Sequence, residues 1–154
     1  MKLENYKVEV LIKLIQQIIK QSKAKISQNV NNQMLWVYWE IGKRIINLEE
    51  ENNIDNQSSR LLINDLSKKL TIRLGKGYSR SNLTYMRLFY LSYKSGVTVS
   101  HQLTWSHYIE LLKVDNDLER GFYQKQAVHE KWSVRELRRQ RNSALFQRYI
   151  FKLF

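Results

Sequence analysis

The chain has 154 residues with 43% hydrophobic and 26% charged side chains, a composition typical of one globular domain and not of a disordered or membrane-embedded chain. It contains no cysteine, which excludes disulfides, thiolate nucleophiles and cysteine-rich zinc sites. Its 26 Lys and Arg against 14 Asp and Glu give a formal net charge of +12, and this excess favours a polyanionic partner: DNA, RNA or an anionic membrane surface.

Long helices are the expected elements, because proline is absent and glycine occurs five times. Apolar residues recur at helical spacing from Leu3 to about Ser27, which predicts an amphipathic first helix, an N-terminal arm over residues 1–28. A second helix is predicted from about Val30 to Glu51. Gly42 lies inside it, and because a mid-helix glycine costs about 1 kcal/mol relative to alanine, we interpret it as the close approach of another helix.

The next two predicted helices are separated by a short turn. Ser58 to Leu74 places leucines on one face, with serines as candidate N-caps. Gly75 to Tyr78 breaks this helix, and Ser79 can cap a fourth helix that continues to about Tyr93. A helix, a short glycine-bearing turn and a capped second helix form the helix-turn-helix pattern.

The rest of the chain predicts more helices. Gly96 to Ser100 could be a loop or a short strand, and helices are expected near Thr104–Val114, near Asp117–Gln126 and from Ser133, where Ser133-Val-Arg-Glu136 is a capping-box pattern. The fold class is therefore all-α: a multi-helix domain containing a helix-turn-helix, winged-helix-like, with or without a minor β-hairpin wing.

Positive charge is concentrated in two segments. From Arg60 to Lys94 there are eight Lys or Arg and one acid, Asp65, a local excess of +7. From Lys131 to Arg148 six Lys or Arg stand against Glu136. A face that only keeps the protein soluble would show interspersed signs, so we interpret both segments as binding patches.

The helix-turn-helix suggests specific contacts. Its second helix would enter the major groove, where Arg reads guanine, Asn reads adenine, and Ser, Thr and Tyr bind phosphates. The backbone N–H groups around Gly77 and Ser79 would face a phosphate at the start of that helix. The leading base-reading candidates are Arg80, Asn82 and Arg87. The full set of predicted nucleic-acid-binding residues is Lys68, Lys69, Arg73, Lys76, Tyr78, Ser79, Arg80, Ser81, Asn82, Thr84, Tyr85, Arg87, Arg135, Arg138 and Arg139.

Patterns for catalysis are weak. The three histidines lack metal-site spacing, and His107 is better explained by a structural or capping role. A metal-dependent nuclease of the restriction type needs a D/E-x-K unit, and no acid in this chain is followed two residues later by lysine. Most aromatic residues lie at helical spacing beside aliphatic ones, which favours core packing over base stacking. We expect no catalytic residue, no metal and no cofactor.

An ordered series of motifs from about Met34 to Arg148 resembles the N-terminal domain of the bacterial YhcG-type PD-(D/E)XK nuclease family. This N-terminal domain is a domain of unknown function. The motifs are Tyr38-Trp-Glu-Ile-Gly-Lys-Arg-Ile45, Leu66-Ser-Lys-Lys-Leu70, Leu74-Gly-Lys-Gly-Tyr-Ser79, Asn82-Leu83, Met86-Arg-Leu-Phe-Tyr90, Gln102-Leu-Thr-Trp-Ser-His107, Phe122-Tyr123 and Trp132-Ser-Val-Arg-Glu-Leu137.

This resemblance implies two parts: a winged-helix-type DNA-binding domain over residues 29–148 and a C-terminal nuclease domain whose residues are missing here. Arg141 and Asn142 depart from the family pattern, which has an apolar and a small polar residue there. The apolar residues 149–154 are expected to be a truncated tail before the nuclease domain.

The leading hypothesis is a non-catalytic module that binds nucleic acid, DNA rather than RNA. The alternative is an assembly module in which the amphipathic N-terminal helix and the apolar tail pair with a second copy or dock a nuclease. No apolar run approaches the ~20 residues of a membrane span, and the N-terminus lacks a secretory pattern. We therefore expect a cytoplasmic chain without a membrane partner or a small-molecule substrate.

Overall fold

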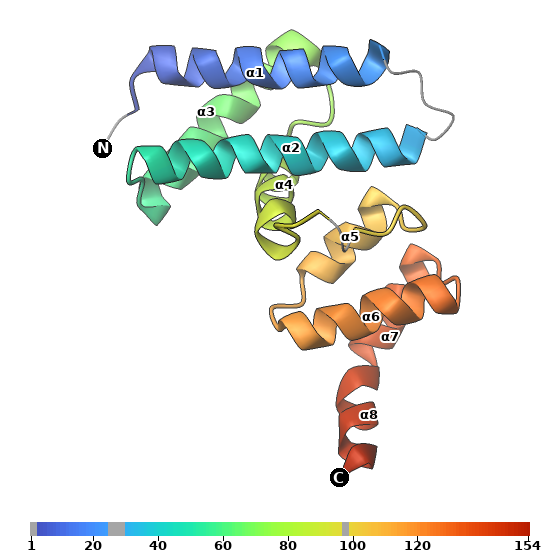
Figure 1. The fold of residues 1–154 in the computed structure, drawn as a ribbon. Coiled ribbons are helices and arrows are strands. Elements are labelled where there is room, and N and C mark those ends of the chain that lie inside the picture. The colour runs from blue at the N-terminus through green and yellow to red at the C-terminus, as the bar shows by residue number, and fades with distance from the viewer. Residues whose placement is uncertain (1–2, 25–29, 97–98) are drawn as a thin grey trace. The chain divides into compact units, whose positions relative to one another are not determined.

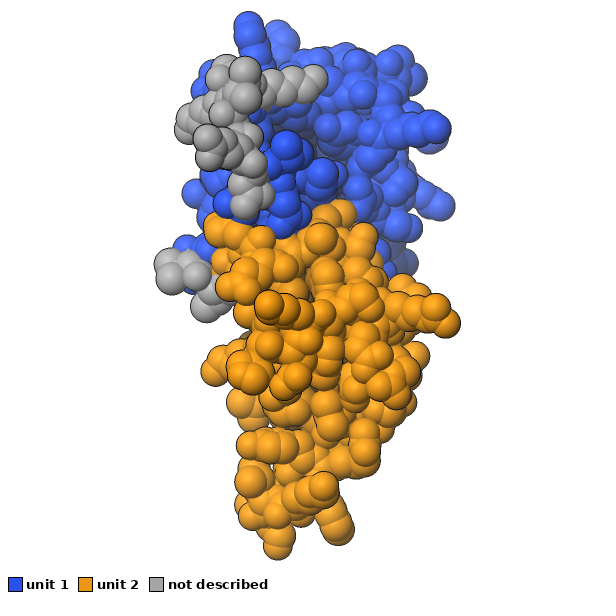
Figure 2. Space-filling view, turned by 90° about the vertical axis from the view of Figure 1, so that its right-hand side faces the viewer, with its two compact units in different colours: residues 1–96 blue, residues 97–154 orange. Residues whose placement is uncertain are grey.

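The computed structural model describes residues 3–24, 30–96 and 99–154, and within these ranges all regular secondary structure is helical. The chain forms two compact units, residues 1–96 and residues 97–154, which have separate colours in Figure 2. The first unit contains α1 (Asn5–Ala24), α2 (Val30–Glu51), α3 (Asn56–Leu74) and α4 (Arg80–Ser92). The second contains α5 (Trp105–Leu112), α6 (Asp117–His129), α7 (Val134–Asn142) and α8 (Leu145–Leu153) (Figure 1).

The first unit is built around the crossing of α2 and α4, its most extensive helix contact. A Cβ atom added to Gly42 of α2 would lie 2.0 Å from the carbonyl oxygen of Met86 in α4 and 3.1 Å from Cβ of Tyr90. The sequence-based interpretation of Gly42 as a close helix approach is therefore confirmed. The Trp39 indole N–H reinforces the crossing, since it donates to the carbonyl oxygen of Tyr93 at 2.7 Å.

Helix α1 covers α2 and α3 within the same unit. Its predicted apolar face is real: Val8, Leu11, Ile12, Ile15 and Ile18 are all buried. The helix runs beside α2 in Figure 1. Its C-terminal bound was predicted near Ser27, but residues 25–29 lie outside the described ranges. Because the apolar face is covered inside the unit, the structure places α1 in the core of residues 1–96.

The helix ends follow local hydrogen-bonding chemistry. The N-cap of α3 is Asp55, whose Oδ1 accepts from the Ser58 backbone N–H at 2.7 Å, so the prediction of a serine cap was wrong. A carboxylate is the stronger acceptor at a positive helix terminus, and it starts the helix two residues earlier than predicted. Ser79 caps α4 as predicted, accepting from the Asn82 N–H.

The second unit packs α5, α6 and α7 around buried aromatic and aliphatic side chains, including Tyr108 and Tyr123. His107 accepts the Thr104 backbone N–H on Nδ1 and contacts the Trp132 carbonyl oxygen through Nε2 at 2.7 Å, so its predicted capping role is confirmed. Ser133 caps α7, while the Glu136 carboxylate accepts from Arg139 and Gln140.

Two expectations differ from the structure. No strand occurs in the described ranges, so a β-hairpin wing is not found there; residues 97 and 98 of the segment considered for a strand lie outside them. Residues 149–153 of the expected tail are helical and belong to α8, which starts after Ala144 in the left-handed conformation (φ 57°). Among the described residues, no helix combines the length and apolar character needed to cross a bilayer.

Candidate functional site

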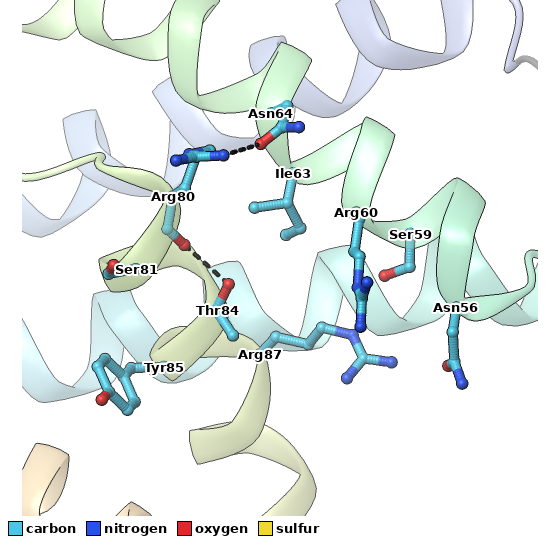
Figure 3. A pocket seen from close by; sticks show the side chains of 10 residues that line it. All are labelled: Asn56, Ser59, Arg60, Ile63, Asn64, Arg80, Ser81, Thr84, Tyr85 and Arg87. Atoms are coloured by element: carbon cyan, nitrogen blue, oxygen red, sulfur yellow. Dashed lines mark hydrogen bonds between the residues drawn. The ribbon is translucent and has the colours of Figure 1, made fainter.

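A polar groove of about 590 Å³ lies between α3 and α4 in the first unit. Three arginines and no acid are among the described residues that line it (Figure 3). The lining residues are Asn56, Ser59, Arg60, Ile63, Asn64, Arg80, Ser81, Thr84, Tyr85 and Arg87. Five of the fifteen predicted binding residues therefore meet in one place: Arg80, Ser81, Thr84, Tyr85 and Arg87.

The turn between α3 and α4 is held from both helices. The buried Ser67 hydroxyl in α3 donates to the Tyr78 carbonyl oxygen at 2.7 Å, and the Asn82 side-chain amide in α4 donates to the Gly77 carbonyl oxygen at 2.6 Å. Gly77 has φ of +107°, a conformation that side chains rarely adopt. Asn82, a predicted base reader, thus also shapes the turn that sets α4 against α3.

Arg80 lies at one end of the groove. Its Nη1 donates to the Asn64 side-chain oxygen at 3.3 Å, a long and exposed hydrogen bond. Its own carbonyl oxygen accepts from the Thr84 hydroxyl at 2.8 Å. This guanidinium makes no ion pair within the described part of the chain, so its charge is available to an anion in the groove.

Arg87 forms an ion pair with Glu49, a partner that the sequence did not predict. The Glu49 carboxylate at the end of α2 is 6% exposed, and both of its oxygens accept from Arg87 Nε, at 3.0 and 2.8 Å. The Ser59 hydroxyl also donates to Glu49. A charge-assisted pair with a buried carboxylate fixes the position of the guanidinium that reaches the groove.

Lys69 and Arg73, further along α3, are paired with acids. Glu9 of α1 pairs with Arg73 at 2.9 Å and with Lys69 at 4.0 Å, and Asp65 pairs with Lys69 at 3.3 Å. Lys68 and Lys76 are exposed. The excess of +7 counted along the sequence is therefore reduced in space by Glu9 and Glu49, and the groove between α3 and α4 is the part of the segment where arginines concentrate.

Half of the second basic segment, in the other unit, is paired with acids: Arg138, Arg139 and Arg141. Glu110 in α5 is 2% exposed and accepts from Arg138 at 2.8 and 3.0 Å, from Arg141 at 2.7 Å and from Lys113 at 3.2 Å. Burial alone would raise the pKa of Glu110, but these hydrogen bonds together hold that pKa below its ordinary value. Arg138 is itself exposed, but its guanidinium is paired with this buried carboxylate.

The other two predicted residues of α7 differ from each other. Arg139 donates to both oxygens of Glu136, at 2.6 and 2.9 Å, and this pair lowers the pKa of Glu136 to about 2. Arg135 is exposed and has no ion pair among the described residues. Among the three predicted arginines of α7, Arg135 is therefore the one whose charge is not offset by an acid among the described residues.

Several groove residues were missed by sequence reasoning. Asn56, Arg60 and Asn64 recur every four residues, which places them on one face of α3. Arg60 belongs to the basic segment, but the predicted binding residues of the first helix are Lys68, Lys69 and Arg73, which lie nearer its C-terminal end. The four-residue spacing of polar residues was the signal that could have found this wall of the groove.

Within the described residues, no group of three or more His, Cys, Asp or Glu is arranged to hold a metal ion. The acids described above each face arginine, lysine or serine partners. What the groove offers chemically is hydrogen-bond donors and positive charge, which suit an anionic ligand.

The chain is helical and basic, and the comparisons place it in a family. Residues 14–148 match the model of the DUF1016 N-terminal domain, so the chain belongs to the DUF1016 N-terminal domain family. This agrees with the YhcG-type resemblance read from the motifs.

One curated relative is the protein called "Putative nuclease YhcG" of Escherichia coli (strain K12), with 31% identity over 163 aligned residues. The alignment covers 85% of this chain and 44% of the relative, so the chain spans less than half of that protein's length. No solved structure matches the chain.

Proposed function

We propose that this chain is the nucleic-acid-binding module of a nuclease-family protein and binds duplex DNA through the groove between α3 and α4. The observation that carries the proposal is the convergence of Arg60, Arg80 and Arg87 on one polar groove without an acid in its lining. Arginine binds phosphate through a planar fork of N–H donors, and such contacts supply most of the affinity of DNA-binding proteins.

The helix-turn-helix remains part of this proposal. The capped start of α4 and the anchored turn would present Arg80, Ser81 and Thr84 to the nucleic acid. The chain itself would be non-catalytic, and cleavage would belong to regions that the relative has beyond the matched part. The relative's name supports only an association with nucleases.

The proposal predicts that an Arg60→Ala/Arg80→Ala variant binds fluorescein-labelled duplex DNA about tenfold or more weakly than the parent near 0.1 M salt. The slope of log K against log salt should fall by about 2, because two phosphate contacts are lost. Fluorescence anisotropy over a salt series measures both quantities.

The matched control is Lys13→Ala/Lys20→Ala, which removes the same charge from exposed positions of α1. We expect it to change affinity by less than about threefold, the effect of net charge alone. Equal losses in both double variants would contradict a groove-specific site, and so would undiminished binding by the groove variant.

A second candidate function is self-association through α8. Its side chains Tyr149, Phe151 and Leu153 are 50%, 84% and 61% exposed, and an apolar hollow of about 490 Å³ lies along Phe146, Ile150 and Phe151. The N-terminal helix is a weaker candidate, because its apolar face is already covered by α2 and α3.

If α8 mediates self-association, light scattering should give a dimer mass for the parent and a monomer mass for Phe151→Glu. The control is Lys152→Glu, which places a negative charge at the neighbouring exposed position and changes the net charge by two units instead of one. A monomeric parent at about 100 μM would rule this function out, since specific interfaces usually hold at that concentration.

A further inference from the structure

The position of the Glu49 carboxylate is unfavourable unless another group offsets its negative charge. It lies in the last turn of α2, where the partial negative charge of the helix end repels a carboxylate, and it is 6% exposed. The last turn of α2 contains no basic residue that could offset this cost. The compensation comes from Arg87 in α4 and Ser59 in α3, both of which line the groove.

The way Arg87 meets Glu49 leaves most of its donors unused. The hydrogen bonds to both carboxylate oxygens come from Nε, at 3.0 and 2.8 Å. A guanidinium has five N–H donors, and the four on Nη1 and Nη2 have no acceptor among the described residues. Arg87 is 27% exposed, so these donors are reachable from the groove.

A second guanidinium reaches the same region. Figure 3 shows Arg60 and Arg87 extending toward the same end of the groove, with Arg80 toward the other end. Two like charges in one groove repel each other unless a counterion lies close. Glu49 is such a counterion for Arg87, and an anion in the groove would be a second.

We propose that Glu49 is a positioning residue that holds Arg87 so that Nη1 and Nη2, together with Arg60, bind the non-bridging oxygens of one phosphodiester group. This inference rests on the proposed function and names the ligand chemistry of the groove: the phosphate backbone of a nucleic acid. It gives Arg87 a phosphate contact in place of the base contact expected from the sequence.

The inference makes a prediction opposite in sign to simple electrostatics. Removing a negative charge beside a phosphate site should strengthen DNA binding if charge alone matters. If Glu49 positions Arg87, then Glu49→Gln should weaken binding, because the guanidinium loses its charged acceptor and its fixed orientation. We expect a loss of about tenfold in affinity and a fall of up to about 1 in the salt slope, because the misplaced Arg87 no longer holds its phosphate.

The experiment compares Glu49→Gln with Glu50→Gln in anisotropy titrations of the full chain with a labelled duplex. Glu50 is the neighbouring exposed carboxylate, so it controls for the loss of one negative charge, and its variant should bind as tightly as the parent or more tightly. Glu49→Gln binding as tightly as the parent overturns the inference.

A second variant keeps the test decisive if Glu49→Gln unfolds. Arg87→Lys retains the charge but loses the planar guanidinium, whose Nε binds Glu49 and whose Nη1 and Nη2 remain for a phosphate, and a single ammonium group cannot reproduce that fixed fork. It should lose about tenfold in affinity, whereas a charge-only role predicts parental binding. The Arg87 Nε–H resonance in ¹⁵N NMR should also move on addition of DNA, and an unmoved resonance contradicts the inference.

The outcomes separate the two proposals. If Arg60→Ala/Arg80→Ala weakens binding while Glu49→Gln and Arg87→Lys bind normally, the groove binds DNA and the positioning role is wrong. If the parent chain does not bind duplex DNA at low salt, both proposals fail.

Discussion

Gly42→Ala is expected to lower the free energy of unfolding of the first unit by roughly 3 kcal/mol or more, although alanine is the better helix former. The added Cβ would meet the Met86 carbonyl oxygen at 2.0 Å, and this neighbour is backbone that cannot rotate away. Helices α2 and α4 must therefore separate, which opens the largest contact of the unit. Urea denaturation followed by far-UV circular dichroism measures the loss, and hydrogen exchange in residues 30–51 locates it.

Gly121→Ala is the matched control, because Gly121 is also inside a helix, α6, and a Cβ there meets nothing within 4 Å. It should stabilise the second unit by about 1 kcal/mol through helix propensity alone. Equal stability of the Gly42→Ala variant and the parent would contradict the crossing described here.

Glu110→Gln is expected to destabilise the second unit by about 1–3 kcal/mol, because the carboxylate is buried but its partners keep part of their hydration. The neutral amide leaves three cations, on Arg138, Arg141 and Lys113, without the buried carboxylate that they share. Glu136→Gln serves as the control, since it removes an acid paired with exposed Arg139, and it should have little effect. Urea unfolding followed by hydrogen exchange in residues 105–142 measures the free energy of unfolding of both variants.

The same carboxylate predicts a pH dependence. The pKa of Glu110 is lower in the folded chain than its ordinary value of 4.5, so the unfolded chain binds the proton more readily. The stabilisation is fully present above pH 4.5 and is lost as the pH falls through the lower folded pKa. Stability measured from pH 6 to pH 3 should fall less steeply in Glu110→Gln. Parallel pH profiles would contradict this role.

Features that depend on neighbouring residues in sequence were predictable. The bounds of α2 were predicted as found, because apolar periodicity continues until the acidic stretch at Glu49 to Glu51. Ser79 and Ser133 were identified as caps because a hydroxyl accepting a nearby N–H is a local interaction. Gly42 was interpreted correctly because a costly residue inside a helix needs a packing reason.

Features that depend on residues far apart in sequence were not predictable. Charge counted along the chain could not show that Glu9, Glu49 and Glu110 come from other helices to pair with the basic segments. The division after Gly96 depends on contacts between helices. Helix α8 starts after a left-handed Ala144 without a side-chain cap, so no residue there marks its beginning.

The most direct test of the central claim is an NMR titration of the ¹⁵N-labelled chain with a duplex DNA. We predict that the amide resonances that move most belong to groove residues of α3 and α4, including Arg60, Arg80 and Thr84, together with the turn at Gly77. Shifts confined to the second unit, or no shifts at low salt, would contradict the account.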